Sequence, residues 1–199
     1  MTTLLRLVVL AVVGLGAALG FGAAPAHGLG AVDDMDVPVT RQVPLLTRVL
    51  SFDRSLEGSA PLVVAVVYQG QNRASRQAHD AFFRALSSRT PTVHGRSIQL
   101  VSVEMSSGGS LTTRLRRVGA DVAYVAPVRG VDVGAVARSA NRAGVLTLTG
   151  VRRYVGDGVA VGIGLRDGRP EILLNRRAAS DAGADLSARL LQLATIVDG

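Results

Sequence analysis

Short runs of apolar and β-branched residues alternate with helix-like segments through the middle of this chain of 199 residues. The first run, Leu62 to Tyr68, is continuously apolar, as strands buried on both faces are. Further strands are expected at 98–103, 121–126 and 145–148, and helices at 73–86, 110–118 and 131–143. Such alternation with short connections predicts a parallel sheet with right-handed crossovers and helices on both faces.

The segment before this region has helical spacing. Apolar residues recur across 39–50, and Pro44 predicts that the helix starts near that residue or is kinked there.

The segment after it changes character. Asp167-Gly168 between apolar runs at 159–165 and 170–174 is a strong signal for an antiparallel hairpin. Residues 184–197 are expected to form a last amphipathic helix that buries Leu186, Leu190, Leu193 and Val197. The fold class expected is therefore α/β: an open, mainly parallel, flavodoxin/Rossmann-like sheet with helices on both faces and a C-terminal antiparallel hairpin.

The first 26 residues have the three parts of a secretory signal peptide. Arg6 is positively charged, residues 7–24 are almost wholly apolar, and Ala24-Pro25-Ala26 predicts cleavage after Ala26. The apolar run of about 18 residues is also near the minimum for a membrane span, so an uncut anchor is the alternative. We expect a periplasmic protein with a signal peptide over 1–26, a linker over 27–38 and one domain over 39–199.

Composition excludes several kinds of chemistry. All 22 cationic residues are arginine, so Schiff-base and P-loop lysines are impossible. There is no cysteine, which excludes disulfides and thiol nucleophiles. The net charge is +7, but the arginines are scattered and aromatic residues make up only 4% of the chain, so nucleic-acid binding is not expected.

The sequence also shows no catalytic or metal-binding motif. His27, His79 and His94 are far apart, and although Asp80 follows His79, no second ligand lies at a metal-binding spacing. We interpret the histidines as surface or helix-face residues. No enzyme activity, metal or cofactor is predicted.

The carboxyl ends of the expected strands are the best candidates for a binding site, because ligands of open parallel sheets lie there. These ends carry Tyr68-Gln69-Gly70 and Thr149-Gly150, and Thr147 lies just before the second group. They are neutral hydrogen-bonding groups with glycines, which suit holding a ligand better than breaking bonds.

Several segments, taken in order, carry a family resemblance: residues 50–52, Tyr68, 122–126, 142–150, 158–165, 169–175 and 186–191. In this combination the chain resembles the YfiR family of periplasmic regulators, also called YfiR/HmsC-like, over roughly residues 39–197. Phe52 and Asn175 lie in these segments. With Tyr68, Gln69, Thr147, Thr149 and Gly150 they make up our set of candidate ligand or partner contacts.

The resemblance implies an exported α/β protein without catalysis. The characterised type binds the periplasmic part of an inner-membrane diguanylate cyclase and holds it inactive, and an outer-membrane protein can sequester the repressor. By this resemblance we expect a repressor whose partner is an inner-membrane sensor or diguanylate cyclase, with an outer-membrane protein and a second copy of the chain as further partners. The best-known members carry disulfide cysteines; this chain has none, so redox control is not expected.

The two function classes left open make different structural predictions. A regulator that acts by protein–protein contact should expose apolar surface, and the segment Val39–Phe52 is the candidate for it. The alternative is a small-molecule-binding module that resembles one lobe of an ABC-type solute receptor, with a pocket at the strand ends.

Overall fold

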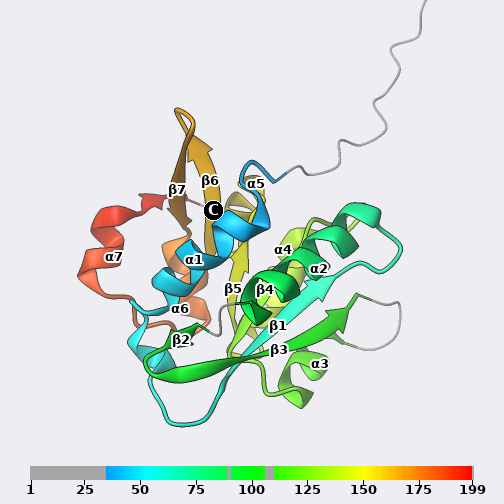
Figure 1. The fold of residues 1–199 in the computed structure, drawn as a ribbon, viewed down its shortest axis with the longest axis horizontal. Coiled ribbons are helices and arrows are strands. Elements are labelled where there is room, and N and C mark those ends of the chain that lie inside the picture. The colour runs from blue at the N-terminus through cyan, green and yellow to red at the C-terminus, as the bar shows by residue number, and fades with distance from the viewer. Residues whose placement is uncertain (1–34, 89–90, 106–109, 199) are drawn as a thin grey trace, which may run out of the picture.

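A computed structural model describes residues 35–88, 91–105 and 110–198, so the expected signal peptide, its cleavage site and most of the linker lie outside the described residues. The fold is one sheet with helices on both faces (Figure 1). Its strands are β1 (Leu62–Tyr68), β2 (Thr92–Val93), β3 (Arg96–Glu104), β4 (Val122–Val125), β5 (Leu146–Thr149), β6 (Val161–Arg166), β7 (Arg169–Leu174) and β8 (Thr195–Ile196). The helices are α1 (Val39–Leu50), a 3-10 turn at Arg54–Leu56, α2 (Arg73–Ser87), α3 (Leu111–Arg117), α4 (Val133–Asn141), α5 (Arg153–Gly156), α6 (Arg176–Asp181) and α7 (Ala188–Leu193).

The sheet has the strand order β2-β3-β1-β4-β5-β6-β7-β8. Strands β3, β1, β4, β5 and β6 are parallel, and β7 runs antiparallel to β6 through the turn at Asp167-Gly168. Strand β2 pairs antiparallel with β3 at one end, and β8 pairs parallel with β7 at the other. The mainly parallel α/β sheet and its C-terminal hairpin are thus confirmed.

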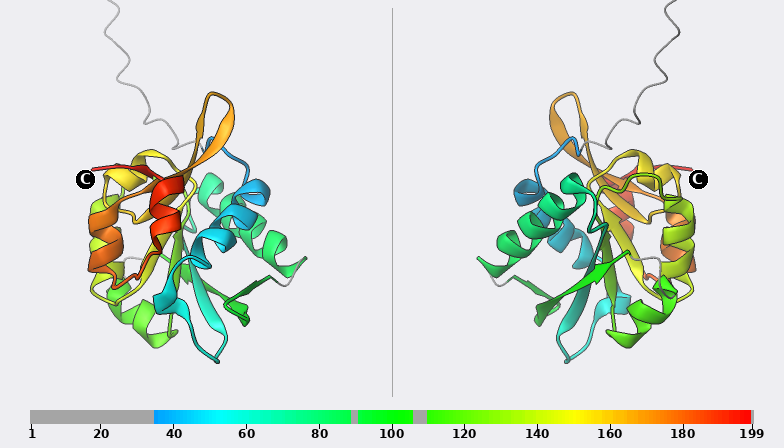
Figure 2. Two further views of the ribbon diagram at one scale, coloured as in Figure 1. Left: turned by 90° about the vertical axis from the view of Figure 1, so that its left-hand side faces the viewer. Right: turned by 90° about the vertical axis from the view of Figure 1, so that its right-hand side faces the viewer.

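Alternate residues of the central strands pack against different helical layers. Val64, Val66 and Tyr124 face α1 and α2, where Leu46 and Phe82 complete the main core. Ala65, Val67 and Ala123 face the opposite layer, which contains Leu115 of α3 and Ala140 of α4. Figure 2 shows α1 and α2 on one face of the sheet and α3, α4 and α6 on the other. The continuous apolar run of β1 therefore follows from burial on both faces.

The N-terminal helix differs from the expectation in its start and its surface. Helix α1 begins at Val39 and continues through Pro44, so the prediction of a start near Pro44 is wrong. Pro44 lies on the exposed side of the helix. Val43 and Leu46 on its apolar side are buried, and their packing stabilises the helix on both sides of the proline. The expected exposed apolar surface on Val39–Phe52 is not found, because the apolar side of this segment forms part of the core.

The C-terminal segment is not the single long helix that we expected. Helix α7 ends at Leu193, and Thr195 and Ile196 form β8 instead. These β-branched residues extend the sheet beside β7, where the N–H of Val197 donates to the carbonyl of Leu174 at 2.9 Å. Leu190 is fully buried as expected, whereas the side of the segment with Leu193, which is 56% exposed, faces outward.

Candidate functional site

The strand ends meet at the point where the strand order reverses. The chain passes from β1 to β3 on one side and then to β4 on the other, so the ends of β1 and β4 flank the switch point. Gln69 bridges them: its Nε2 donates to the carbonyl of Arg129 at 3.1 Å, and the N–H of Arg129 donates to its Oε1 at 2.9 Å. A cavity of about 450 Å³ lies beside this bridge, lined by Gln69, Gln71, Asn72, Arg73, Ala74, Gln77 and Arg129.

Tyr68 belongs to an aromatic and polar cluster between α2 and β3. Its ring lies 4.3 Å from that of His79, which is 4.5 Å from the ring of Phe83. His79 Nε2 contacts Ser102 Oγ at 2.7 Å, and its Nδ1 contacts Asp80 Oδ1 at 2.8 Å. The order of atoms resembles a serine hydrolase triad. However, Ser102 and Asp80 lie at the surface, and none of the cavities described here reaches Ser102, so we interpret the cluster as the contact that fixes α2 on the sheet.

Thr147 and Thr149 are buried, and their hydroxyl groups are used within the fold. Thr147 Oγ1 accepts from the N–H of Ala160 at 2.9 Å. Thr149 Oγ1 donates to the carbonyl of Val125 at 3.0 Å and accepts from the N–H of Val151 at 3.1 Å. Both threonines have no exposed surface. These hydroxyls join neighbouring strands and loops and do not point into a cavity.

Gly150 is needed where α1 crosses the strand ends. A Cβ atom at this position would lie 2.1 Å from Nε2 of Gln42. Gln42 is fully buried, and its Oε1 accepts from the hydroxyl of Tyr124 at 2.9 Å. Burial raises the pKa of Tyr124 well above its usual range, so the phenol stays protonated and remains the donor. The space over Gly150 is thus filled by α1.

Phe52 and Asn175 lie elsewhere. Phe52 is half-buried against the core, and its carbonyl accepts from the N–H of Ser187 at 2.9 Å. Asn175 begins α6: its Oδ1 accepts from the N–H of Ala178 at 2.9 Å, and its Nδ2 donates to the carbonyl of Val155 at 3.0 Å. Of the seven candidates, the structure brings only Tyr68, Gln69, Thr149 and Gly150 to the strand ends, and only the first two are partly accessible.

A second surface, which was not predicted from the sequence, lies at the other end of the sheet. We name it the β8 edge and define it by Leu193, Thr195 and Ile196. Leu193 is 56% and Ile196 41% exposed, and they are the large apolar side chains that the described residues leave exposed. A first hollow of about 710 Å³ lies between this edge, α1 and the β6–β7 hairpin, lined by Leu45, Arg48, Arg166, Asp167, Arg169, Pro170, Glu171, Ile172, Leu193 and Thr195. A second of about 470 Å³ is lined by Asn175, Arg176, Arg177, Ile196, Val197 and Asp198.

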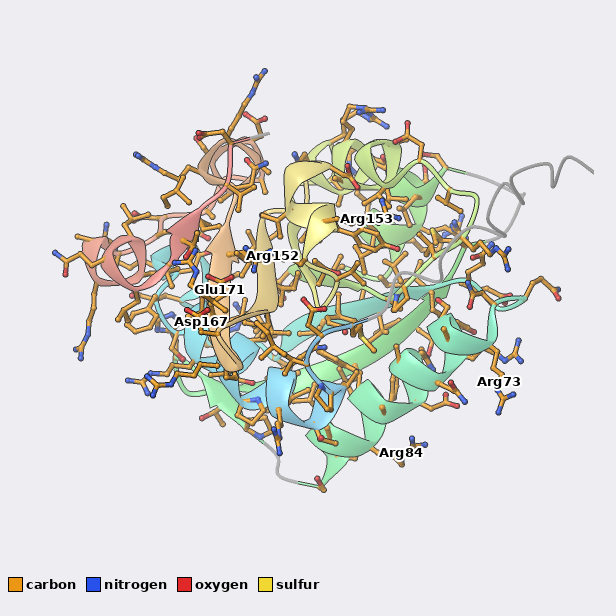
Figure 3. The ribbon with its side chains drawn as sticks, turned by 90° about the horizontal axis from the view of Figure 1, so that it is seen from above. Arg73, Arg84, Arg152, Arg153, Asp167 and Glu171 are labelled. Atoms are coloured by element: carbon orange, nitrogen blue, oxygen red, sulfur yellow. The ribbon has the colours of Figure 1, made fainter. Side chains whose placement is uncertain are left out.

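Glu171 is the best-partnered acid of this surface. Its carboxylate accepts from Arg152, from Arg166 Nε at 3.1 Å and from the hydroxyl of Thr195 at 3.0 Å. Burial favours its protonated form, but the hydrogen bonds and the arginine charges outweigh burial and hold the pKa of Glu171 below its usual value. Figure 3 shows Arg152 and Glu171 close together, well away from Arg73 and Arg84 on α2. Glu171 is thus charged and already neutralised within the protein.

No ion pair or hydrogen bond is recorded, across the described ranges, for the side chains of Arg48, Arg169, Arg176 and Arg177. The part of the chain that the structure describes contains no group of three or more His, Cys, Asp or Glu placed to hold a metal ion. In residues 35–88, 91–105 and 110–198 no helix is long and apolar enough to cross a membrane.

The fold is shared with several solved structures. It is similar to a conserved domain protein from Vibrio cholerae (16% identity, TM-score 0.56, 80% of this chain and 60% of that one). It is also similar to the ligand-free substrate-binding protein CD0873 from Clostridium difficile (13%, 0.55, 81% and 60%) and to an ABC domain in complex with L-Trp from Streptococcus pneumoniae (11%, 0.54, 80% and 62%). The chain spans about three fifths of these structures, and at such identities the likeness shows the fold alone.

The sequence then identifies the family. The profile of the YfiR/HmsC-like family matches residues 57–195, and the chain belongs to that family. A comparison with curated proteins found no match. The family membership predicted from the sequence is confirmed.

Proposed function

We propose that this chain is a periplasmic regulatory protein without catalytic activity, which holds a membrane-bound signalling protein of the diguanylate cyclase type inactive by binding its periplasmic part. The observation that carries the proposal is the exposure of Leu193 and Ile196 at one sheet edge, whereas the other large apolar side chains of the described residues are buried or partly buried. Exposed apolar groups with a polar rim are typical of protein contact sites. Family membership supports the same role.

Export is part of this proposal. The expected signal peptide delivers the chain to the periplasm with cleavage after Ala26, followed by the linker over 27–38 and the domain over 39–199. Sequencing the N-terminus of protein recovered from the periplasm should give His27 first. A chain that starts at Met1 and stays with the membrane would support the uncut anchor.

The regulatory role is tested by reconstitution. Bacterial inner membranes that contain a diguanylate cyclase with a periplasmic domain are mixed with the mature protein, and cyclic-di-GMP synthesis is measured. We expect inhibition by the native chain and weaker inhibition by Leu193→Asp. Leu191→Ala, on the half-buried side of α7, is a control for changes in the packing of that helix. An outer-membrane protein that sequesters the repressor should restore synthesis. Equal inhibition by the native chain and Leu193→Asp would contradict the role of this edge.

A small-molecule-binding module is the second candidate. The cavity of about 450 Å³ at the switch point favours it, because it lies where ligands of parallel sheets bind and is lined by the amide side chains of Gln71 and Gln77. One similar structure holds L-Trp, which makes amino acids the first compounds to screen. A saturable rise in Tm that is reduced in Gln69→Ala would support this function. No shift with any amino acid would remove its support.

A further inference from the structure

Strand β8 has a free side. On its other side, the N–H of Val197 donates to the carbonyl of Leu174 in β7. Main-chain groups of successive strand residues point to opposite sides, so those of Ile196 point away from β7. Among the described residues no strand pairs with β8 on that side. The edge therefore presents a donor and an acceptor to an incoming chain.

The two hollows lie on either side of this edge. Thr195 lines the first hollow together with Leu45 and Arg48 of α1. Ile196 lines the second together with Arg176 and Arg177 of α6. Helices α1 and α6 cover opposite faces of the sheet (Figure 2). Successive side chains of an added strand also point to opposite faces, so they would enter the two hollows in turn.

The charge of the lining selects the partner. Arg48 and Arg169 in the first hollow and Arg176 and Arg177 in the second have no acidic partner among the described residues. Of the acids present, Glu171 is already paired with Arg152 and Arg166, which leaves only Asp167 and Asp198. The free cations outnumber the free acids. The exposed Leu193 lines the first hollow and the exposed Ile196 lines the second.

We propose that the β8 edge binds an extended segment rich in acidic and large apolar residues, which adds to the sheet as a further strand. The inference rests on the proposed function, because it takes this segment to belong to the periplasmic part of the membrane partner. Main-chain pairing at Ile196 supplies part of the affinity. The arginines of both hollows and the exposed apolar side chains select the sequence.

The test uses the mature protein and a fluorescent eight-residue peptide with the repeat Glu-Glu-Leu-Val, which places both acidic and apolar side chains on each face of the added strand. Binding is followed by fluorescence polarisation. We expect saturable binding that is at least tenfold weaker for the peptide with Lys in place of Glu. Methylation of alternate backbone nitrogens of the Glu peptide should also weaken its binding at least tenfold, because a methylated nitrogen cannot donate a hydrogen bond to β8.

Two protein variants with the same change in net charge provide the matched comparison. Arg169→Glu with Arg177→Glu reverses one cation in each hollow, whereas Arg84→Glu with Arg117→Glu reverses exposed cations on α2 and α3. Figure 3 shows the position of Arg84, far from β7. We expect the first pair to weaken binding at least tenfold and the second to leave it within twofold. Unchanged circular dichroism spectra for both would exclude a folding defect.

Several results would overturn the inference: equal binding of the Lys peptide, no effect of N-methylation, or equal effects of the two variant pairs. A concentration-dependent dimer in sedimentation that Arg169→Glu with Arg177→Glu dissociates would assign the edge to a second copy of the chain instead. If the membrane protein is inhibited but edge variants act normally, this inference fails while the proposed function stands. If the peptide binds as expected but no cyclase responds, the proposed function fails.

Discussion

Two leucines one turn apart on α7 should differ strongly in how much the same substitution lowers the free energy of unfolding. Leu190 is fully buried, whereas Leu193 is 56% exposed. Leu190→Ala removes packed core atoms and leaves a cavity, which typically costs about 2–5 kcal/mol of unfolding free energy. Leu193→Ala removes few contacts, so the change should stay within about 0.5 kcal/mol. Urea unfolding followed by circular dichroism at 222 nm measures both.

The same pair separates stability from binding. Burying a whole leucine side chain contributes about 1.5–3 kcal/mol, and somewhat more than half of that remains for a partner to gain at Leu193. Leu193→Ala should therefore weaken partner binding by about 1–1.5 kcal/mol, roughly five- to tenfold in Kd. A loss of stability of 2 kcal/mol or more in Leu193→Ala would refute the reasoning, since it would mean that Leu193 is packed within the fold.

Three further substitutions test the rest of the structure by urea unfolding. Glu171→Gln should cost about 1 kcal/mol at pH 7. Because the folded pKa of Glu171 lies below its ordinary value of 4.5, the difference from the native chain should persist above pH 4.5 and vanish as the pH falls further; a pH-independent difference would contradict this. Gly150→Ala should cost about 1–3 kcal/mol by displacing the buried amide of Gln42, and a neutral result would show that Gln42 moves freely. Asn175→Ala should cost about 1 kcal/mol through loss of the α6 cap. Asn175→Asp keeps the cap acceptor but should also lower stability, because its carboxylate cannot donate to the buried carbonyl of Val155.

The central fold could be read from the sequence because each signal there is local. The run Leu62–Tyr68 matches β1 at both ends. Gly144 directly follows the helix expected at 131–143, and its φ of 72° is typical of a glycine that ends a helix. The turn at Asp167-Gly168 also forms, with both residues at positive φ. In these places local preference and tertiary packing favour the same conformation.

The C-terminus could not be read in this way because its conformation depends on a distant strand. Leucines spaced along 184–197 fit a helix by periodicity, yet Thr195 and Ile196 pair with Leu173 and Leu174 of β7. Asn175 gave a local signal for α6, since asparagine is a favoured N-cap residue, but it lay directly after a strand and was interpreted as a contact residue.

The candidate site was missed for a related reason. Hydrogen-bonding residues at strand ends are typical of ligand sites, but the same groups also join a parallel sheet to its loops, and Thr147 and Thr149 do so here. The space above Gly150 is taken by Gln42 of α1, a contact that joins residues far apart in the sequence. The exposure of Leu193 and Ile196 could not be predicted from the sequence, because it depends on the helix ending at Leu193 and on Thr195 and Ile196 forming a strand. In this chain the polar strand ends hold the fold together, and the large apolar side chains left exposed among the described residues lie at the end of α7 and on β8. That division favours recognition along the sheet edge over capture of a ligand in the cleft.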